Sequence, residues 1–65
     1  MKILLNEIMY ERGLSYQAVA SMTGISKTTV YIIANNKVSP TANALETLAK
    51  GLKIHIVDLI ESPYK

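Results

Sequence analysis

The sequence predicts a small all-α domain. Its apolar residues recur at intervals of three and four rather than in alternation, which is the spacing of helices that bury one face. Serine, threonine and glycine stand where such helices would begin and end. A chain of 65 residues has room for one domain, so residues 1–65 are expected to form a single unit.

The first helix is expected from about Lys2 to Arg12. Gly13 then ends it, because glycine readily adopts the left-handed conformation found at helix C-termini. The apolar residues with helical spacing in this segment are Leu5 and Ile8, together with Met1 and Met9. These side chains are expected to face the core.

Residues 15–33, SYQAVASMTGISKTTVYII, contain the most informative pattern. Ser15 is a good N-cap, and Val19 follows on the apolar face of a short helix. Gly24 ends this helix, because glycine enters positive φ without steric cost and so allows a sharp turn. A second short helix follows at once, so the pattern predicts a helix-turn-helix motif over about residues 15–34.

The second helix of this motif begins after Ile25, which supplies an apolar plug at the turn. Ser26 is its expected N-cap, and Val30 and Ile33 point inward by helical spacing. Ala20 in the preceding helix lets the two helices approach closely. A bulky residue at position 20 is therefore expected to be destabilising.

A further helix is expected after residues 39–41. Ser39, Pro40 and Thr41 form a helix start signal, with either Ser39 or Thr41 as the cap. The apolar side of this helix consists of Leu45, Leu48 and Leu52.

The stretch from Lys53 to Ile60 is ambiguous, because KIHIV alternates like a strand while IVDLIE repeats like a short helix. Its apolar residues are more than one short helix can bury against a small core: Ile54, Ile56, Val57, Leu59 and Ile60. They predict contact with a partner, and the alternative is that they cap the core of the monomer. Pro63 stops any helix, so residues 62–65 are expected to form a short tail.

Composition narrows the class of protein. Apolar residues make up 49% of the chain and the aromatic ones are four tyrosines, so aliphatic residues must fill the core. The absence of cysteine excludes a disulfide and suits a reducing cytosol, so a cytoplasmic location is expected. No apolar run approaches the roughly 20 residues that a membrane span requires.

The distribution of charge is more informative than the net charge of +2. From Arg12 to Thr41 the charged residues are Arg12, Lys27 and Lys37, and all are basic. All five acidic residues lie outside this interval. A polyanion is therefore expected to approach the motif without meeting a carboxylate.

Catalysis is not expected. The one histidine, His55, has no cysteine, second histidine or nearby carboxylate pair with which to form a metal site or a triad. The three glycines are isolated, so no phosphate-binding loop is present. We expect no cofactor and no metal. A small-molecule ligand is not expected either, because so small a domain has little spare volume for a pocket.

The segment GLSYQAVASMTGISKTTVYIIANNK resembles the helix-turn-helix of the Cro/C1-type (phage-repressor-like, Xre) DNA-binding family. LNEIMYERG resembles the first helix of that family, and SPTANALETLAKGLKIHIVDLI resembles its fourth and fifth helices. The resemblance implies a compact five-helix, lambda-repressor-like domain that places its third helix in the DNA major groove. It also implies a homodimer formed through the C-terminal apolar residues.

The chain departs from the family pattern at several positions. Tyr16 stands where the family usually has a glutamine that touches a DNA phosphate, and Gln17 comes one residue later. Thr23 replaces an aliphatic residue, and Ala34 and Asn36 stand where the family usually has glutamate and glycine. Asn36 is compatible with a helix end, because asparagine tolerates the left-handed conformation.

Helical spacing identifies the residues that would read DNA. With Val30 and Ile33 inward, Thr28, Tyr31, Ile32 and Asn35 point outward, with Lys27 at the edge. The candidates for base reading are Ser26, Lys27, Thr28, Tyr31 and Ile32. The candidates for phosphate contact are Tyr16, Gln17, Thr29, Asn35, Asn36 and Lys37.

Two functions follow from these residues. The first is a sequence-specific regulator of transcription that binds double-stranded DNA, a small Cro-like repressor or autoregulator of bacterial or phage origin. It would bind an inverted repeat as a homodimer, using Ile54, Ile56, Val57, Leu59 and Ile60 as its interface. The alternative is a protein-interaction module, such as an antitoxin or anti-repressor, in which the same fold turns Tyr16, Tyr31 and Ile32 toward a protein.

Overall fold

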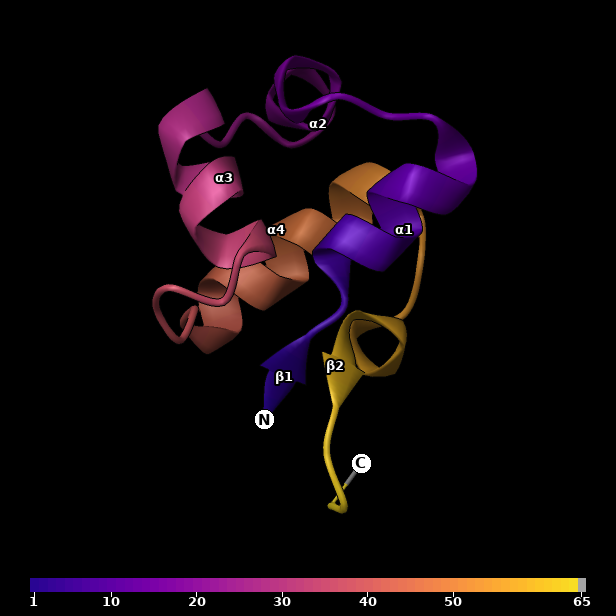
Figure 1. Cartoon of the computed structure of the whole chain (residues 1–65), viewed down its shortest axis with the longest axis vertical. Coiled ribbons are helices and arrows are strands. Elements are labelled where there is room, and N and C mark those ends of the chain that lie inside the picture. The colour runs from indigo at the N-terminus through magenta and orange to yellow at the C-terminus, as the bar shows by residue number, and fades with distance from the viewer. Residues whose placement is uncertain (65) are drawn as a thin grey trace.

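The computed structural model describes residues 1–64. Lys65, the last residue of the expected tail, lies outside the described residues. The elements are β1 (Lys2–Ile3), α1 (Leu5–Arg12), α2 (Tyr16–Thr23), α3 (Lys27–Ala34), α4 (Ala42–Leu52), the 3-10 helix η1 (Ile56–Leu59) and β2 (Ile60–Glu61). Along the long axis of the molecule, α2 lies at one end and the two strands lie at the other (Figure 1). The structure confirms a mostly helical domain.

The expected count of five helices is wrong: residues 1–64 contain four α-helices and the single turn η1. The fifth helix is missing because its segment is bounded on both sides. Lys53 ends α4 in the left-handed conformation, with φ of 59°, and Ile60 is already extended. Between them, Asp58 Oδ2 accepts a hydrogen bond of 3.1 Å from the His55 N–H, which closes a short turn.

The two short strands form an antiparallel ribbon. Lys2 lies opposite Glu61 and Ile3 opposite Ile60, and the ribbon continues with a 2.7 Å hydrogen bond from the Leu4 N–H to the Leu59 carbonyl. The first helix therefore begins at Leu5 and not at Lys2 as expected. Extended backbone at Lys2–Ile3 pairs with the C-terminal segment and turns Ile3 into the core.

Side-chain caps begin three of the helices, as the sequence indicates. Ser15 Oγ accepts from the Ala18 N–H at 3.0 Å, and Ser26 Oγ accepts from the Thr29 N–H at 3.2 Å. Of the two candidates for the fourth helix, Thr41 is the cap, with its hydroxyl 3.1 Å from the Ala44 nitrogen. Each cap satisfies one of the free N–H groups at a helix start.

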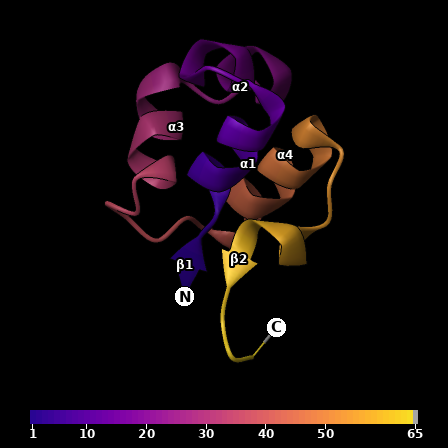
Figure 2. The ribbon, with the colours of Figure 1, turned by 45° about the vertical axis from the view of Figure 1, so that its right-hand side comes forward.

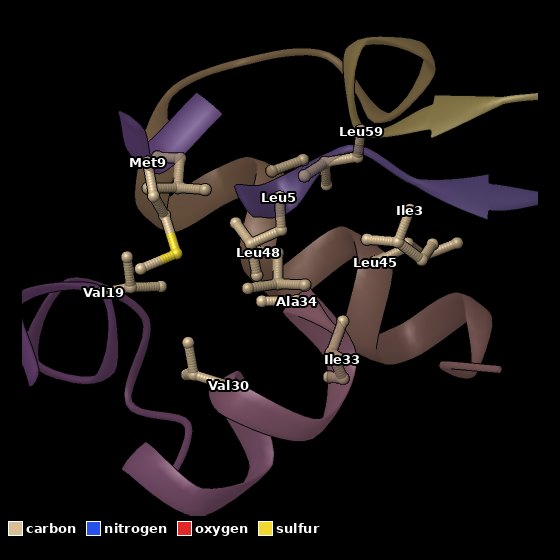
Figure 3. Packing of buried hydrophobic residues seen from close by; sticks show 12 residues of the cluster. Ile3, Leu5, Met9, Val19, Val30, Ile33, Ala34, Leu45, Leu48 and Leu59 are labelled. Carbon is tan, nitrogen blue, oxygen red and sulfur yellow. The ribbon is translucent and has the colours of Figure 1, made fainter. Parts of the chain in front are cut away.

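One apolar core joins every element except β2, which borders it (Figure 3). Its buried members are Ile3, Leu5, Met9, Val19, Val30, Ile33, Ala34, Leu45, Leu48, Ala49, Leu52 and Leu59. The inward positions predicted for Val19, Val30 and Ile33 are confirmed. The expectation for Met1 is wrong, since its side chain is 65% exposed, and Ile8 is only half-buried at the edge of the core.

Helices α2 and α4 pack closely at Gly51. A Cβ at this position would lie 2.7 Å from the Met22 carbonyl oxygen and 2.9 Å from Thr23 Cα, so only glycine fits. The end of α2, where the turn of the motif begins, is thus set directly on α4. None of the helices in the part of the chain that the structure describes has the length and apolar content of a membrane span.

Candidate nucleic-acid interface

The turn between α2 and α3 is built by two residues. Gly24 ends α2 with φ of 78°, as predicted from the sequence. Thr23 braces the same turn, because its hydroxyl donates to the Val19 carbonyl at 2.8 Å and accepts from the Ile25 N–H at 3.2 Å. An aliphatic side chain at position 23 could make neither bond. These contacts hold α3 at a defined angle to α2 (Figure 2).

Helix α3 has one buried and one exposed face. Val30, Ile33 and Ala34 are buried, which also accounts for a small residue at position 34. The predicted base-reading residues Lys27, Thr28 and Tyr31 are exposed, as are the N-cap Ser26 and Thr29, while Ile32 is half-buried. The Ser26 hydroxyl caps the helix and also donates to Thr29 Oγ1 at 2.8 Å, so both hydroxyls are paired at the N-terminus of α3.

An aromatic pair links the two motif helices. The rings of Tyr16 and Tyr31 meet edge to face, with centroids 5.4 Å apart and planes at 86°. The Lys37 ammonium lies 5.8 Å from the centroid of the Tyr31 ring, within the range of a cation–π interaction. One base-reading candidate, Tyr31, and two phosphate candidates, the half-buried Tyr16 and the exposed Lys37, therefore form one cluster at the surface.

A polar network fixes the same cluster to α1. Asn35 Nδ2 donates to the Tyr16 hydroxyl at 3.1 Å and to the Tyr31 carbonyl at 2.9 Å. Asn6 in α1 donates to Asn35 Oδ1 at 3.3 Å, and its own Oδ1 accepts a long 3.5 Å contact from the Tyr16 hydroxyl. We call these residues the Asn6–Tyr16–Asn35 network.

Sequence reasoning missed Asn6. No local signal could have found it, because its partners lie 10 and 29 positions away along the chain. Asn35 was predicted from the sequence to contact phosphate, and the structure shows that its amide oxygen and nitrogen already hold Tyr16, Tyr31 and Asn6 in place.

Asn36 has a structural task that the sequence did not indicate. Its backbone is left-handed, with φ of 56°, as the sequence led us to expect. Its side chain accepts from the Ile3 N–H at 2.8 Å and donates to the Ile3 carbonyl at 3.1 Å. The amide thus pairs with β1 as a neighbouring strand would, and ties the end of α3 to the ribbon. Its polar atoms serve this clamp, which is a different role from the predicted phosphate contact.

The charge around the motif differs from the expectation in two respects. The Arg12 guanidinium donates to the Leu52 carbonyl at 2.8 Å, at the end of α4, and so does not belong to the motif surface. Glu7 and Glu11 of α1 line a groove together with Tyr16 at the start of α2. The acids are absent from the motif in sequence, but the fold places two of them beside it.

The C-terminal apolar residues divide between core and surface. Leu59 is 0% exposed, so its predicted place in a dimer interface is wrong: η1 turns it inward, where the monomer buries it. Ile54 and Ile60 are half-buried and pack against the core. Ile56 and Val57 remain 37% and 51% exposed, on the outer side of η1.

The described geometry defines a helix-turn-helix domain with an exposed second motif helix. The family model of the Cro/C1-type HTH DNA-binding domain matches residues 4–63, which is nearly the whole chain. The chain therefore belongs to the Cro/C1-type helix-turn-helix DNA-binding family. No curated protein and no solved structure matches the chain.

Proposed function

We propose that this protein is a sequence-specific transcriptional regulator that binds double-stranded DNA. The observation that carries the proposal is the exposed face of α3, held by a braced turn in a domain of the Cro/C1-type family. Lys27 would donate to guanine N7 and O6, and Thr28 would bond a base edge or meet a thymine methyl group. Tyr31 would donate to a base or a phosphate.

Contacts with phosphates would come from the borders of the motif. The candidates are the Tyr16 hydroxyl, Gln17, Lys37 and the N–H groups at the starts of α2 and α3. The Tyr16 hydroxyl makes only a long 3.5 Å contact as a donor, so a phosphate oxygen offers it a better acceptor. Tyr16 would thereby replace the glutamine usual at this position.

The active form would be a homodimer on an inverted repeat, and regulation would be by occupancy of a promoter as a Cro-like repressor or autoregulator. Ile56 and Val57 support the dimer, because they expose neighbouring apolar side chains on one turn. Leu59 has no part in this interface. A two-fold dimer would present two copies of α3 to successive major grooves.

The test is selection of bound sequences from a random duplex library by the purified chain. Recovery of an inverted repeat, with half-sites about one helical turn apart, is the expected result. A matched selection with the Lys27→Ala variant should lose the preference at one position of each half-site. Recovery of no sequence above background would contradict the proposal.

A protein-interaction module is the second candidate. It is favoured by the apolar content of the motif surface, where Tyr31 is 44% exposed and Ile32 half-buried. Salt separates the two functions, since binding to phosphates weakens steeply with added salt and an apolar protein contact does not. This second function would be established if the chain bound a protein partner with an affinity insensitive to salt and did not bind DNA.

A further inference from the structure

An open groove lies between α1 and the start of α2 and is bordered by Tyr16, whose ring contacts Tyr31 of α3. Its volume is about 670 Å³, within the range of about 300–1,000 Å³ typical of small-molecule sites. The lining residues are Asn6, Glu7, Met9, Tyr10, Glu11, Leu14, Ser15 and Tyr16. The groove is open to solvent, and so differs from the enclosed pocket for which the sequence leaves little room.

The lining combines apolar, aromatic and acidic groups. Leu14 supplies apolar surface, Met9 borders the groove but is buried in the core, and Tyr10 and Tyr16 supply aromatic rings. Tyr10 is 89% exposed and Leu14 half-buried, which leaves their apolar atoms accessible to a ligand. Glu7 and Glu11 are one helical turn apart on α1, so both carboxylates border the same groove.

The charge of this lining is of one sign. None of the eight lining residues is basic, and two are carboxylates. Carboxylates beside tyrosine rings attract a cation through both Coulomb and cation–π interactions. The same lining repels anions, so neither a phosphate nor a carboxylate ligand suits the groove.

We propose that this groove binds a small lipophilic organic cation. The apolar surface would accept the hydrocarbon part of the ligand, and the rings and Glu7 and Glu11 would accept its positive charge. A cation of this class is favoured over a protein segment because the groove is bordered by only two turns of α1 and the first residues of α2. Its volume matches a molecule of drug size.

The groove shares two residues with the Asn6–Tyr16–Asn35 network. Asn6 and Tyr16 line the groove, and their polar atoms meet each other and Asn35 on the DNA side. A ligand that moves the Tyr16 ring would change the position of its hydroxyl and the edge-to-face contact with Tyr31. Ligand and DNA would then alter each other's affinity by the same factor. This second step, unlike the binding itself, rests on the proposed function.

The first experiment measures binding of tetraphenylphosphonium to the full chain by calorimetry, with tetraphenylborate as the matched probe. The two ions have nearly the same size and apolar surface and opposite charge. The phosphonium should bind and should shift the amide resonances of Leu14 and Tyr16, and the borate should bind more weakly. Equal binding of both ions, or no binding of either, would overturn the proposal.

Variants test whether the carboxylates of Glu7 and Glu11 hold the cation. A Glu7→Gln, Glu11→Gln double variant should weaken the phosphonium affinity about fivefold, while Glu46→Gln on α4 should leave it unchanged. Thermal unfolding checks that each variant is folded. Equal effects of the double variant and the Glu46 control would show that the groove carboxylates do not hold the cation.

DNA binding is then measured with and without the phosphonium on the selected operator. A change in affinity is expected, and the Glu7→Gln, Glu11→Gln variant should reduce it. An unchanged affinity would overturn the coupling but not the site. If the chain binds the phosphonium and no DNA at all, the site stands and the proposed function is wrong.

Discussion

At the scale of single residues, two asparagines that follow α3 connect distant parts of the chain. Asn35 joins α1, α2 and α3 through the Asn6–Tyr16–Asn35 network. Asn36 clamps Ile3 with two hydrogen bonds across 33 positions of sequence. The orientation of the outer face of α3 therefore depends on side-chain amides as well as on apolar packing.

The contribution of the two Asn36 hydrogen bonds to stability can be measured separately from the strain of the left-handed backbone at this residue. Asn36→Gly keeps that conformation accessible but deletes both bonds, so we expect a loss of stability of about 1 kcal/mol in urea unfolding. Lys53 has a similar φ of 59° and an exposed side chain, and Lys53→Gly should gain up to about 1 kcal/mol. Hydrogen exchange of the Ile3 amide should accelerate in the first variant alone. A gain of stability in both variants would show that the clamp contributes little.

The residues proposed to contact DNA are expected to fall into two kinds. Lys37→Ala should weaken binding about equally on all duplexes and lower the salt slope by about 1, because it removes a phosphate contact. Thr28→Ala should relax the preference at one base position by roughly 1–3 kcal/mol. Fluorescence anisotropy on matched and mismatched operators measures both effects. Identical behaviour of the two variants would contradict these roles.

At the scale of elements, the angle between α2 and α3 depends on the support that α4 gives to the end of α2. Gly51 brings α4 against the Met22 carbonyl, and Thr23 continues from this contact into the turn. The close neighbours of Gly51 are backbone atoms of Met22 and Thr23 and the Thr23 methyl group, whose side chain is held by its hydrogen bonds in the turn, so none of them can readily move aside.

Substitution of Gly51 tests this support. Gly51→Ala should destabilise the domain by about 1–3 kcal/mol, since the new Cβ meets backbone atoms, although alanine is the better helix former. Lys50→Ala, one residue earlier and exposed, should change stability by less than about 0.5 kcal/mol. Chemical denaturation of both variants measures the difference. Unchanged stability of Gly51→Ala would mean that α2 and α4 separate without cost.

At the scale of the whole molecule, η1 and β2 contribute to the fold of the monomer. Leu59 completes the core, and the ribbon joins the two ends of the described chain. Of the five C-terminal apolar residues of the proposed dimer interface, Ile56 and Val57 are the exposed ones. A dimer would thus form on a surface that the monomer has already ordered.

The two sides of η1 should respond differently to substitution. Val57→Asp should leave the monomer folded but abolish the dimer and lower operator affinity, because it places a charge on exposed apolar surface. Leu59→Ala should cost about 2–5 kcal/mol of folding stability, since it leaves a cavity in the core. Sedimentation and thermal unfolding distinguish the outcomes. A Val57→Asp protein that still dimerises would place the interface elsewhere.

Local sequence was enough to predict the four α-helices, the caps at Ser15 and Ser26, and the buried face of α3, while the choice of Thr41 over Ser39 as the cap of α4 came from the structure. These features depend on residues three or four positions apart, so local periodicity and capping chemistry suffice to predict them. Exposure of Lys27, Thr28 and Tyr31 followed from the same spacing, whereas Ile32, which was also expected to point outward, is half-buried. Their contacts with DNA remain predictions.

The ribbon, the burial of Leu59, the clamp of Asn36 on Ile3 and the groove beside Tyr16 could be seen only in the folded chain. Each of these joins residues that are distant in the chain. The stretch from Lys53 to Ile60 contains both a strand-like and a helix-like pattern, and in the structure it forms the 3-10 turn Ile56–Leu59 followed by the strand Ile60–Glu61, which pairs with β1. Long-range contacts produce no periodic pattern in the sequence. They could therefore not be predicted from local spacing, and the tertiary structure was needed to identify them.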